Sequence, residues 1–290
     1  MDWIRGIQRA IDYIENHITD ELDYDEIARC AYSSKFHFQR VFSIMCGYSI
    51  GEYIRNRRLT LAGNELICTS EKVIDIAFKY GYDSPDSFSK AFTRFHGITP
   101  SSARENGSNL KSFSKLSIKL SLEGGNMMKY RIEEKEAMSF VGFKKQFSGD
   151  LTARFKQEHN MWITTRDEQE LLIGIRSEVA TWYDINTNFS DNDYDHYIAV
   201  KTDKQAPRGF ERINIPKTTY AIFETEPSKY PTRTHEELRK KVISEWLPSS
   251  DYILSEGAEI TVCHWHKNPN AEKRYIELWI PVEKLKDLKS

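Results

Sequence analysis

The sequence predicts a protein of two domains, an all-α domain followed by an α+β domain. A chain of 290 residues is long enough to bury two hydrophobic cores. Helical apolar periods and an internal repeat occupy the first hundred residues, whereas a strictly alternating pattern begins at Leu116. We therefore expect a helical domain over 1–106, a linker with the first strand of a hairpin over 107–126, and a second domain over 127–286.

The composition is that of a globular protein without a membrane span. Hydrophobic residues make up 39% of the chain, and no apolar run approaches the roughly 18 residues that a membrane helix needs. The four cysteines lack CxxC spacing, and His264 and His266 lack a third ligand, so we expect no metal and no cofactor. The N-terminus carries charges throughout, which argues against a signal peptide. The cysteines, three of them in helical patterns, fit a reducing, cytoplasmic setting. The net charge of −2 excludes bulk coating of nucleic acid but allows a site-specific reader.

An internal repeat with an offset of about fifty residues organises the first half of the chain. Ile27 and Ala28 recur at Ile76 and Ala77, and a one-residue insertion follows before the next matching tyrosine. The later pairs are Tyr32 with Tyr82, Ser34 with Ser84, Phe38 with Phe88, Arg40 with Lys90, Phe42 with Phe92, Gly47 with Gly97 and Ser49 with Thr99. So many ordered matches indicate two copies of one structural unit.

Each copy has the pattern of a helix, a turn and a second helix. In the first copy Asp23 is the expected cap, and Glu26 completes a capping box. In the second copy Ser70 is expected to cap the first helix. Ser84 is expected to cap the second helix, and Pro85 takes its first position, where a missing N–H costs nothing. The first half therefore predicts a double helix-turn-helix domain.

The second helix of each copy carries side chains that are typical of DNA recognition. A second helix held by a tight turn can reach the major groove, where Arg, Lys and Gln pair with base edges. The phenylalanine stripes would be core in any small helical domain, so the candidate contacts lie on the opposite faces. They are Lys35, Phe36, Gln39 and Arg40 in the first copy, and Asp86, Ser87, Ser89, Lys90 and Arg94 in the second.

The stretch between the copies predicts a helix of about 18 residues, which spans roughly 27 Å. With its flanking turns it can hold the two second helices about one DNA turn, roughly 34 Å, apart. Arg55, Arg57 and Arg58 cluster within it. We expect Arg55, before the other two, to contact phosphate; the alternative is that all three form a solvated helix face.

The first half resembles the DNA-binding domain of AraC/XylS-type transcription regulators. The stretches IARCAYSSKFHFQRVFSIMCGYSIGEYIRNRRL and IDIAFKYGYDSPDSFSKAFTRFHGITPSSAR carry the resemblance. It implies two helix-turn-helix units joined by a rigid helix, with base contacts at Phe36, Gln39 and Arg40 and at the matching residues of the second copy. Phe36 stands where tryptophan is common, which favours stacking. Asp86 stands where an amide is common, and it either accepts from cytosine or caps its helix.

The second half mixes strands with two helices. The alternating stretch from Leu116, with Gly124 and Gly125 at its centre, predicts a β-hairpin. Helices are expected over 150–170 and 234–247. Strands are expected over 137–143, 171–180, 195–201, 210–215, 218–225, 258–265 and 274–282. A strand pair, a helix and further strands occur twice in this order.

The strand KRYIELWIPV alternates in a way that suggests a ligand site. Ile276, Leu278 and Ile280 share one side, and the other side carries Tyr275, Glu277 and Trp279. A carboxylate between two aromatic rings suits a cationic, apolar ligand. On spacing alone, the favoured alternative is an exposed sheet face with Glu277 in water.

A second resemblance covers residues 127–284 and favours the ligand site. MKYRIEEKEAMSFVGF, TTYAIFETEP, EELRKKVISEWLPSS and YIELWIPV resemble the GyrI-like effector-binding domain of Rob-like regulators. The resemblance implies a curved antiparallel sheet built from two strand-helix-strand units around a ligand cleft. It makes Glu277 the pocket acid, with wall residues at Tyr275, Trp279, Trp182, Tyr220 and Trp162.

Together the two halves predict a sequence-specific, DNA-binding transcription regulator whose second domain binds a small apolar or cationic effector. The expected partners are double-stranded promoter DNA, the effector and, for an activator, RNA polymerase; no membrane partner is expected. Two reading helices in one chain allow a monomer or a weak dimer. The alternative is a small-molecule hydrolase with Glu277 as general base, but a base alone does not make an active site, so an enzyme is not expected.

Overall fold

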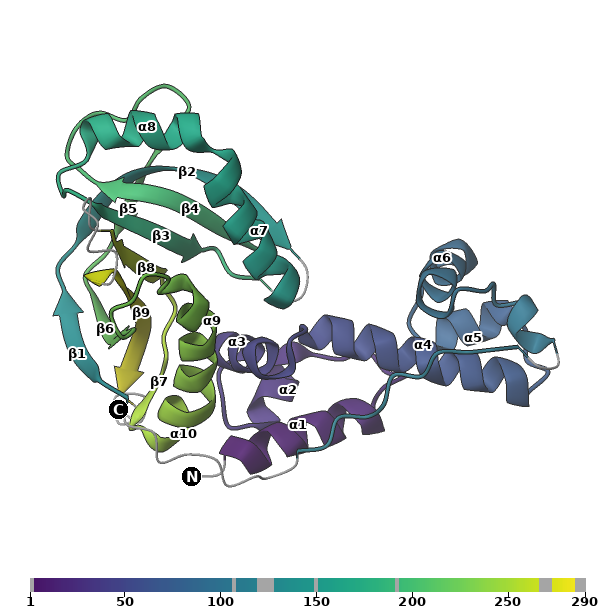
Figure 1. The fold of residues 1–290 in the computed structure, drawn as a ribbon. Helices are drawn as coiled ribbons and strands as arrows, with labels where there is room; N and C mark the ends of the chain where they lie inside the picture. The colour runs from purple at the N-terminus through teal and green to yellow at the C-terminus, as the bar shows by residue number, and fades with distance from the viewer. Residues whose placement is uncertain are drawn as a thin grey trace. The chain divides into compact units, whose positions relative to one another are not determined.

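The computed structural model describes residues 3–105, 108–118, 128–148, 151–190, 193–265 and 273–284. The chain divides into two compact units, one formed mostly by residues up to 121 and the other mostly by residues from 122 onward (Figure 1). Among the described helices, none is long and apolar enough to cross a membrane. The predicted order of an all-α region followed by an α+β region is confirmed.

All the regular secondary structure in the described part of the first unit is helical. Its elements are α1 (Trp3–Asn16), α2 (Tyr24–Cys30), α3 (Lys35–Cys46), α4 (Ile50–Cys68), α5 (Val73–Lys79), α6 (Pro85–His96) and a short 3-10 turn, η1 (Ser102–Arg104). Helices α2 and α3 form the first helix-turn-helix, α5 and α6 form the second, and α4 connects them. This arrangement confirms the predicted double motif.

The two copies of the repeat align differently at the turn from what the sequence predicted. The turn residue with positive φ is Tyr32 in the first copy and Gly81 in the second, so these positions correspond. The next amides, Ser33 N and Tyr82 N, both donate to the equivalent helix carbonyls. The extra residue of the second copy therefore lies after the turn, at Asp83, and not before it.

The helix ends agree with the sequence at some positions and not at others. Asp23 caps α2 by accepting from Asp25 N at 2.9 Å, and Ser84 caps α6 by accepting from Ser87 N at 3.2 Å. Ser70 does not cap α5, because that helix begins two residues later than predicted, after Lys72. A capping box that the prediction missed joins Ser49 and Glu52 at the start of α4.

An extended segment, residues 108–118, crosses the helical unit along α4 and α1 (Figure 1). Thr60 Oγ1 accepts from Phe113 N at 2.9 Å, and Arg57 donates to Phe113 O at 2.6 Å. Leu116 N donates to the Tyr53 hydroxyl at 3.3 Å. These side-chain partners replace the ladder of a sheet, so the strand expected from Leu116 is not formed within 108–118. The hairpin centre at 124–125 lies outside the described residues.

The second unit is built on one large antiparallel sheet. Its strands are β1 (Tyr130–Lys135), β2 (Met138–Ser148), β3 (Thr181–Thr187), β4 (Asp193–Lys201), β5 (Glu211–Ile215), β6 (Thr218–Glu224), β7 (Tyr252–Leu254), β8 (Glu259–His264) and β9 (Tyr275–Lys284). The order across the sheet is β1-β6-β9-β8-β3-β4-β2-β5, with β7 paired to the end of β9. Every pairing among these strands is antiparallel.

The sheet contains the same unit twice, as the sequence order suggested. In the first half β2 leads to the helices α7 (Leu151–Thr164) and α8 (Arg166–Ile175) and then to β3 and β4. In the second half β6 leads to α9 (Thr232–Lys241), a π-helical stretch (Val242–Trp246) and α10 (Leu247–Ser249), and then to β8 and β9. The strand that precedes each unit pairs with the other unit: β1, before β2, pairs with β6, and β5, before β6, pairs with β2. This exchange ties the two halves into one sheet.

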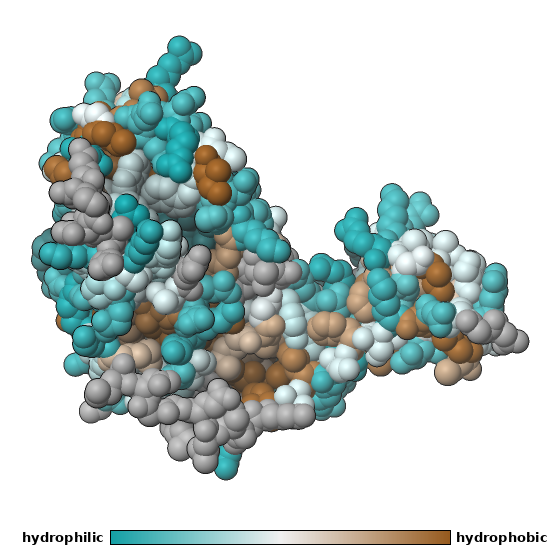
Figure 2. Space-filling model, viewed as in Figure 1, coloured by the Kyte–Doolittle hydropathy of each residue, from teal (hydrophilic) through white to brown (hydrophobic). Residues whose placement is uncertain are grey.

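The predicted strand over 171–180 is wrong. Residues up to Ile175 belong to α8, and β3 begins only at Thr181. Gln169 and Leu172 are buried three residues apart, whereas Leu171 and Ile173 are 55% and 46% exposed. A short apolar run fits either a strand or a helix, and here packing on one helical face decided the outcome. Some of the brown patches on the largely hydrophilic surface in Figure 2 lie over α8.

Both faces of the sheet are buried. The face covered by α7 and α8 carries a core that includes Phe143, Met161, Leu172, Trp182 and Ile198. The opposite face carries a second core of strand residues that includes Phe140, Tyr183, Tyr220, Ile222 and Trp279. Tyr220 and Ile222 are fully buried among residues of other strands, so the sheet curves around this second core.

Candidate nucleic-acid interface and ligand cavity

Helix α6 presents the predicted contact residues of the second copy away from its core. Phe88 and Phe92 are fully buried on one side. The opposite side carries Asp86, Lys90 and Arg94, four residues apart and all exposed. Ser87 is also exposed, and Ser89 is half-buried at the edge of this face.

The start of α6 gives two of these residues a structural task as well. Ser87 Oγ donates to Ser84 O at 2.8 Å, so it takes part in the helix cap. Asp86 lies in the first turn, where a carboxylate interacts favourably with the helix dipole. Ser84, and not Asp86, is the cap of α6, so Asp86 supports the helix only through its dipole. Lys90 and Arg94 are the positive groups of this face.

Helix α3 presents a less exposed set. Lys35 is exposed at the first turn and lies 3.6 Å from Asp25, measured from Nζ to Oδ2. Phe36, Gln39 and Arg40 are half-buried. They lie away from Phe38 and Phe42, which are buried in the core. The two helices thus differ in character, because α3 combines an aromatic ring with an amide and a guanidinium.

The arginine cluster of α4 separates into one exposed and two structural residues. Arg57 pairs with Glu15 at 2.8 Å and also holds residues 108–118 through Phe113 O. Arg58 donates to the carbonyls of Ile18 and Asp20, both at 2.7 Å. Arg55 is exposed and lies 3.9 Å from Glu52. The alternative of a wholly solvated arginine face is therefore wrong for Arg57 and Arg58.

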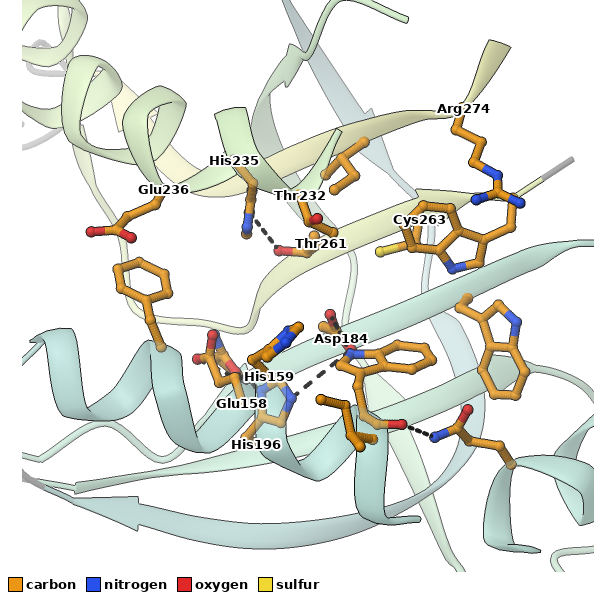
Figure 3. Close-up of a pocket in the computed structure, with 18 of the residues that line it drawn as sticks. Glu158, His159, Asp184, His196, Thr232, His235, Glu236, Thr261, Cys263 and Arg274 are labelled. Carbon is orange, nitrogen blue, oxygen red and sulfur yellow. Dashed lines mark hydrogen bonds and ion pairs between the residues drawn. The ribbon is translucent and has the colours of Figure 1, made fainter. Parts of the chain in front are cut away.

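The second unit contains a cavity of about 770 Å³ between its helices and the sheet. It is bounded by α7, α8 and α9 and by the adjacent faces of β3, β4 and β8 (Figure 3). Aromatic walls come from Phe155, Trp162, Trp182 and Trp265. The polar and charged lining includes Glu158, Asp184, Asn186, His196, His235 and Arg239.

Two of the six predicted ligand residues, Trp162 and Trp182, line this cavity. Their rings meet edge to face, with centroids 5.5 Å apart. The Trp162 indole N–H donates to both carboxyl oxygens of Asp184, at 3.0 and 3.2 Å. The sequence did not single out Asp184, although it alternates with the buried Tyr183 and Ile185 along β3 and so faces the other side of the sheet. That alternation was the available signal.

The other four predicted ligand residues, Tyr220, Tyr275, Glu277 and Trp279, lie on the opposite face of the sheet. The predicted alternation along β9 is correct, since Ile276 joins the core on the helical side and Trp279 joins the core on the other side. Tyr220 packs on Trp279 with ring centroids 5.7 Å apart, and Tyr275 stacks on His264 at 4.2 Å. The structure therefore does not bring the six residues into one site, because the sheet has two buried faces.

Glu277 is held by partners from its own chain. Arg131 donates to its Oε1 at 2.7 Å, and the Trp279 indole donates to its Oε2 at 2.8 Å. His264 Nε2 lies 3.8 Å from the same oxygen. Burial opposes ionisation, but His264, Arg131 and Trp279 together outweigh it and lower the pKa of Glu277 to about 2. Glu277 is consequently an internally paired carboxylate and not the exposed side chain that spacing alone favoured.

The cavity contains a cluster of titratable groups that was not predicted from the sequence. His196 lies between two carboxyl groups, with Nδ1 3.8 Å from Glu158 Oε1 and Nε2 3.9 Å from Asp184 Oδ1. Burial raises the pKa of Glu158 and raises that of Asp184 well above its usual value. Burial, together with the charge of Arg239, lowers the pKa of His196 to about 3. The imidazole is therefore neutral at physiological pH.

A buried ion pair closes one side of this cluster. Arg239 on α9 lies 2.5 Å from Glu259 on β8, and both side chains are less than 10% exposed. His235, one turn earlier on α9, shares a hydrogen bond of 3.2 Å with Thr261 Oγ1. Burial and the charge of Arg239 lower the pKa of His235 to about 4. Among the described residues, no group of three or more His, Cys, Asp or Glu is arranged to hold a metal ion.

Comparison with known proteins assigns both units. A family described as a helix-turn-helix domain matches residues 27–106, and a family described as integron-associated effector binding protein matches residues 131–282. The transcriptional activator AarP of Providencia stuartii is 45% identical over 95 residues, which are 33% of this chain and 70% of AarP. Regulatory protein SoxS of Salmonella typhimurium is 42% identical over 98 residues, 34% of this chain and 92% of SoxS. The structure of SAV2435 bound to tetraphenylphosphonium covers 55% of this chain and 97% of SAV2435, at 17% identity and a TM-score of 0.46.

The fold and these matches define a DNA-binding transcription regulator that carries an effector-binding domain. The chain belongs to the AraC family of regulators, with a C-terminal domain of the integron-associated effector-binding family. Both resemblances drawn from the sequence are thereby confirmed. The relatives named here are regulators, and the comparisons give the hydrolase alternative no support.

Proposed function

We propose that this regulator reads promoter DNA with the exposed faces of α3 and α6 and senses its effector in the cavity on the helical side of the sheet. The observation that carries the proposal is that one chain combines a double helix-turn-helix unit with a large, aromatic-walled cavity. Effector binding regulates the promoter if the ligand binds one DNA-binding arrangement of the chain more tightly than another. The target promoter DNA lies with the chromosome, so we also propose a cytoplasmic location.

On the DNA side, we assign base contacts to α3 and α6 and a phosphate contact to α4. Gln39, Arg40 and Lys90 have the side chains that pair with base edges, and Arg55 is the exposed arginine of the connecting helix. Phe36 supplies an apolar contact to a base. The remaining contact candidates are Lys35, Asp86, Ser87, Ser89 and Arg94. Two reading helices in each chain remove the need for a dimer, so we propose that a monomer suffices; contact with RNA polymerase remains a prediction.

The DNA assignment can be tested by selecting binding sites from random duplexes and then titrating the selected site. At about 0.15 M salt, the protein should prefer that site over random DNA by at least about 10³-fold. Arg40→Ala and Lys90→Ala should each cost about 1–3 kcal/mol and relax specificity at one base pair. Arg55→Ala should weaken binding to all sequences alike and reduce the salt dependence. A wild-type protein without any sequence preference would refute the assignment.

On the effector side, we propose an apolar, cationic ligand. Trp162 and Trp182 offer aromatic faces, and the carboxyl of Asp184 lies beside them. Aromatic rings and a carboxylate together attract an organic cation. Glu277 is less suited to this role, because Arg131 already occupies one of its oxygens.

Two probes of similar shape separate charge recognition from apolar burial. Methyltriphenylphosphonium is a cation, and triphenylphosphine oxide is neutral. The cation should raise the melting temperature of the full chain more than the neutral probe does. Asp184→Asn should abolish this difference, whereas Glu277→Gln should retain it. The reverse pattern would move the site to the Glu277 face, as the sequence first predicted.

A further inference from the structure

The carboxyl groups of the cavity differ in the positive charge that lies near them. Its acidic groups on the inner wall are Glu158, Asp184 and, behind Arg239, Glu259. Arg239 pairs directly with Glu259, and its charge partly offsets the burial that raises the pKa of Glu158. Asp184, by contrast, gains no favourable cationic contribution: its pKa is raised by burial and by the charge of Glu158, and is lowered by the Trp162 hydrogen bond.

Asp184 is placed so that the cavity itself is its main environment. Its side chain is 16% exposed, and this exposed surface faces the cavity (Figure 3). Beyond Trp162, its near polar neighbour is His196 Nε2 at 3.9 Å. That nitrogen is buried and has no hydrogen-bond partner in the described structure. A buried polar atom without a partner next to a carboxyl indicates a site that a further group completes.

The imidazole does not supply the missing positive charge. His196 Nδ1 lies 2.7 Å from the side-chain oxygen of Asn186, and the ring is only 1% exposed. A neutral imidazole with its proton on Nδ1 donates to Asn186 and leaves Nε2 as an acceptor facing Asp184. An acceptor in that position favours a protonated Asp184, whose O–H can point toward Nε2. Without a cation beside it, Asp184 is therefore suited to the neutral form.

We propose that Asp184 holds a proton before a cationic effector binds and releases it on binding. The O–H bond of Asp184 breaks, the proton passes to solvent through the open side of the cavity, and the carboxylate formed pairs with the cation. Effector binding is thereby coupled to pH, because each ligand must displace a proton. This inference rests on the proposed function, since it requires a cation in this cavity.

Charged and titratable groups on every surrounding element bear on this exchange. They are Arg154, Glu158 and His159 on α7, Arg166 on α8, Asp184 itself on β3, His196 on β4, His235, Glu236 and Arg239 on α9, Glu259 and the titratable thiol of Cys263 on β8, and Arg274 before β9. Of these, Glu158 is the second possible proton source, because burial also raises its pKa. Tyr194, however, donates to Glu158, and Arg239 acts on it by charge, and both favour its ionised form.

The direction of the pH dependence follows from proton linkage. When the cation binds only the ionised site, its affinity rises about tenfold per pH unit as long as Asp184 is protonated in the free protein. Above the pKa of Asp184 the affinity becomes independent of pH. In the rising range, about one proton should leave for each ligand bound.

The test is isothermal titration of the full chain with methyltriphenylphosphonium in two buffers of different ionisation enthalpy. At pH 6 the observed heat should differ between the buffers by the amount that corresponds to about one released proton. Asp184→Asn should bind more weakly and release none, while its thermal melt shows an intact fold. Glu236→Gln, which removes a carboxyl from the same cavity, is the matched control and should keep the release.

The outcomes separate this inference from the function on which it rests. Cation binding without proton release, or with release that is lost in Glu158→Gln and kept in Asp184→Asn, would overturn the inference and leave the effector site standing. If the cation bound at no pH between about 5 and 8, both the effector site and the inference would fail.

Discussion

The carboxyl groups of Glu277 and Asp184 lie on opposite faces of one sheet and have opposite electrostatic environments. Their side chains are 10% and 16% exposed, so burial is similar. Glu277 has a guanidinium and an indole N–H as partners, and its pKa falls to about 2. Burial and the charge of Glu158 raise the pKa of Asp184, and its one indole N–H does not offset them. Burial raises the pKa of both carboxyls, and only Glu277 has partners that outweigh it; the partners therefore decide which acid serves structure and which remains available to a ligand.

The largest expected effect is the loss of stability on removing the Glu277 charge. Glu277→Gln should lower the free energy of unfolding by about 2–3 kcal/mol, because Arg131 and the Trp279 N–H lose a charged acceptor. Asp184→Asn should change it by less than about 1 kcal/mol, since the amide keeps the shape of the group and no cation is left unpaired. Urea unfolding followed by tryptophan fluorescence measures both, and equal losses would contradict the comparison.

The pH dependence of stability should have opposite signs for the two groups. The folded pKa of Glu277 is depressed, so its contribution is present above the unfolded value near 4.5 and is lost as pH falls toward about 2. The folded pKa of Asp184 is raised, so its contribution is present below 3.8 and is lost as pH rises through the folded pKa.

This contrast can be measured by comparing each variant with the wild type across pH. The stability difference between wild type and Glu277→Gln should shrink as pH falls from about 5 to 2. The stability of Asp184→Asn should rise relative to that of the wild type as pH rises above about 4. Parallel curves for the two variants would mean that the two carboxyls share one environment.

The smallest expected effect concerns the indole donors. Trp162→Phe keeps an aromatic wall but removes the N–H that stabilises the Asp184 carboxylate. It should weaken cation binding about fivefold, or about 1 kcal/mol. Trp279→Phe removes the equivalent donor to Glu277 and should leave cation affinity unchanged. A loss of affinity in Trp279→Phe alone would reverse the assignment of the ligand face.

The helical unit was largely predictable because its signals are local. The repeat, the caps at Asp23 and Ser84 and the phenylalanine stripes each depend on residues a few positions apart, and the structure confirms them. The role of Arg57 was not predictable. It depends on Glu15 and on Phe113, which are 42 and 56 residues away in the chain, and no local pattern announces them.

In the second unit, local sequence patterns were enough to predict most elements, their repeated order and the alternation along β9. The tertiary structure decided the rest. Alternation states which side chains share a face, but it cannot say which face a helix covers or where a cavity remains. Those outcomes depend on how β3 and β8 meet at the centre of the sheet and on how α7 and α9 pack beside them. For this reason the sequence pointed to Glu277, whereas the folded chain placed Asp184 beside the open space.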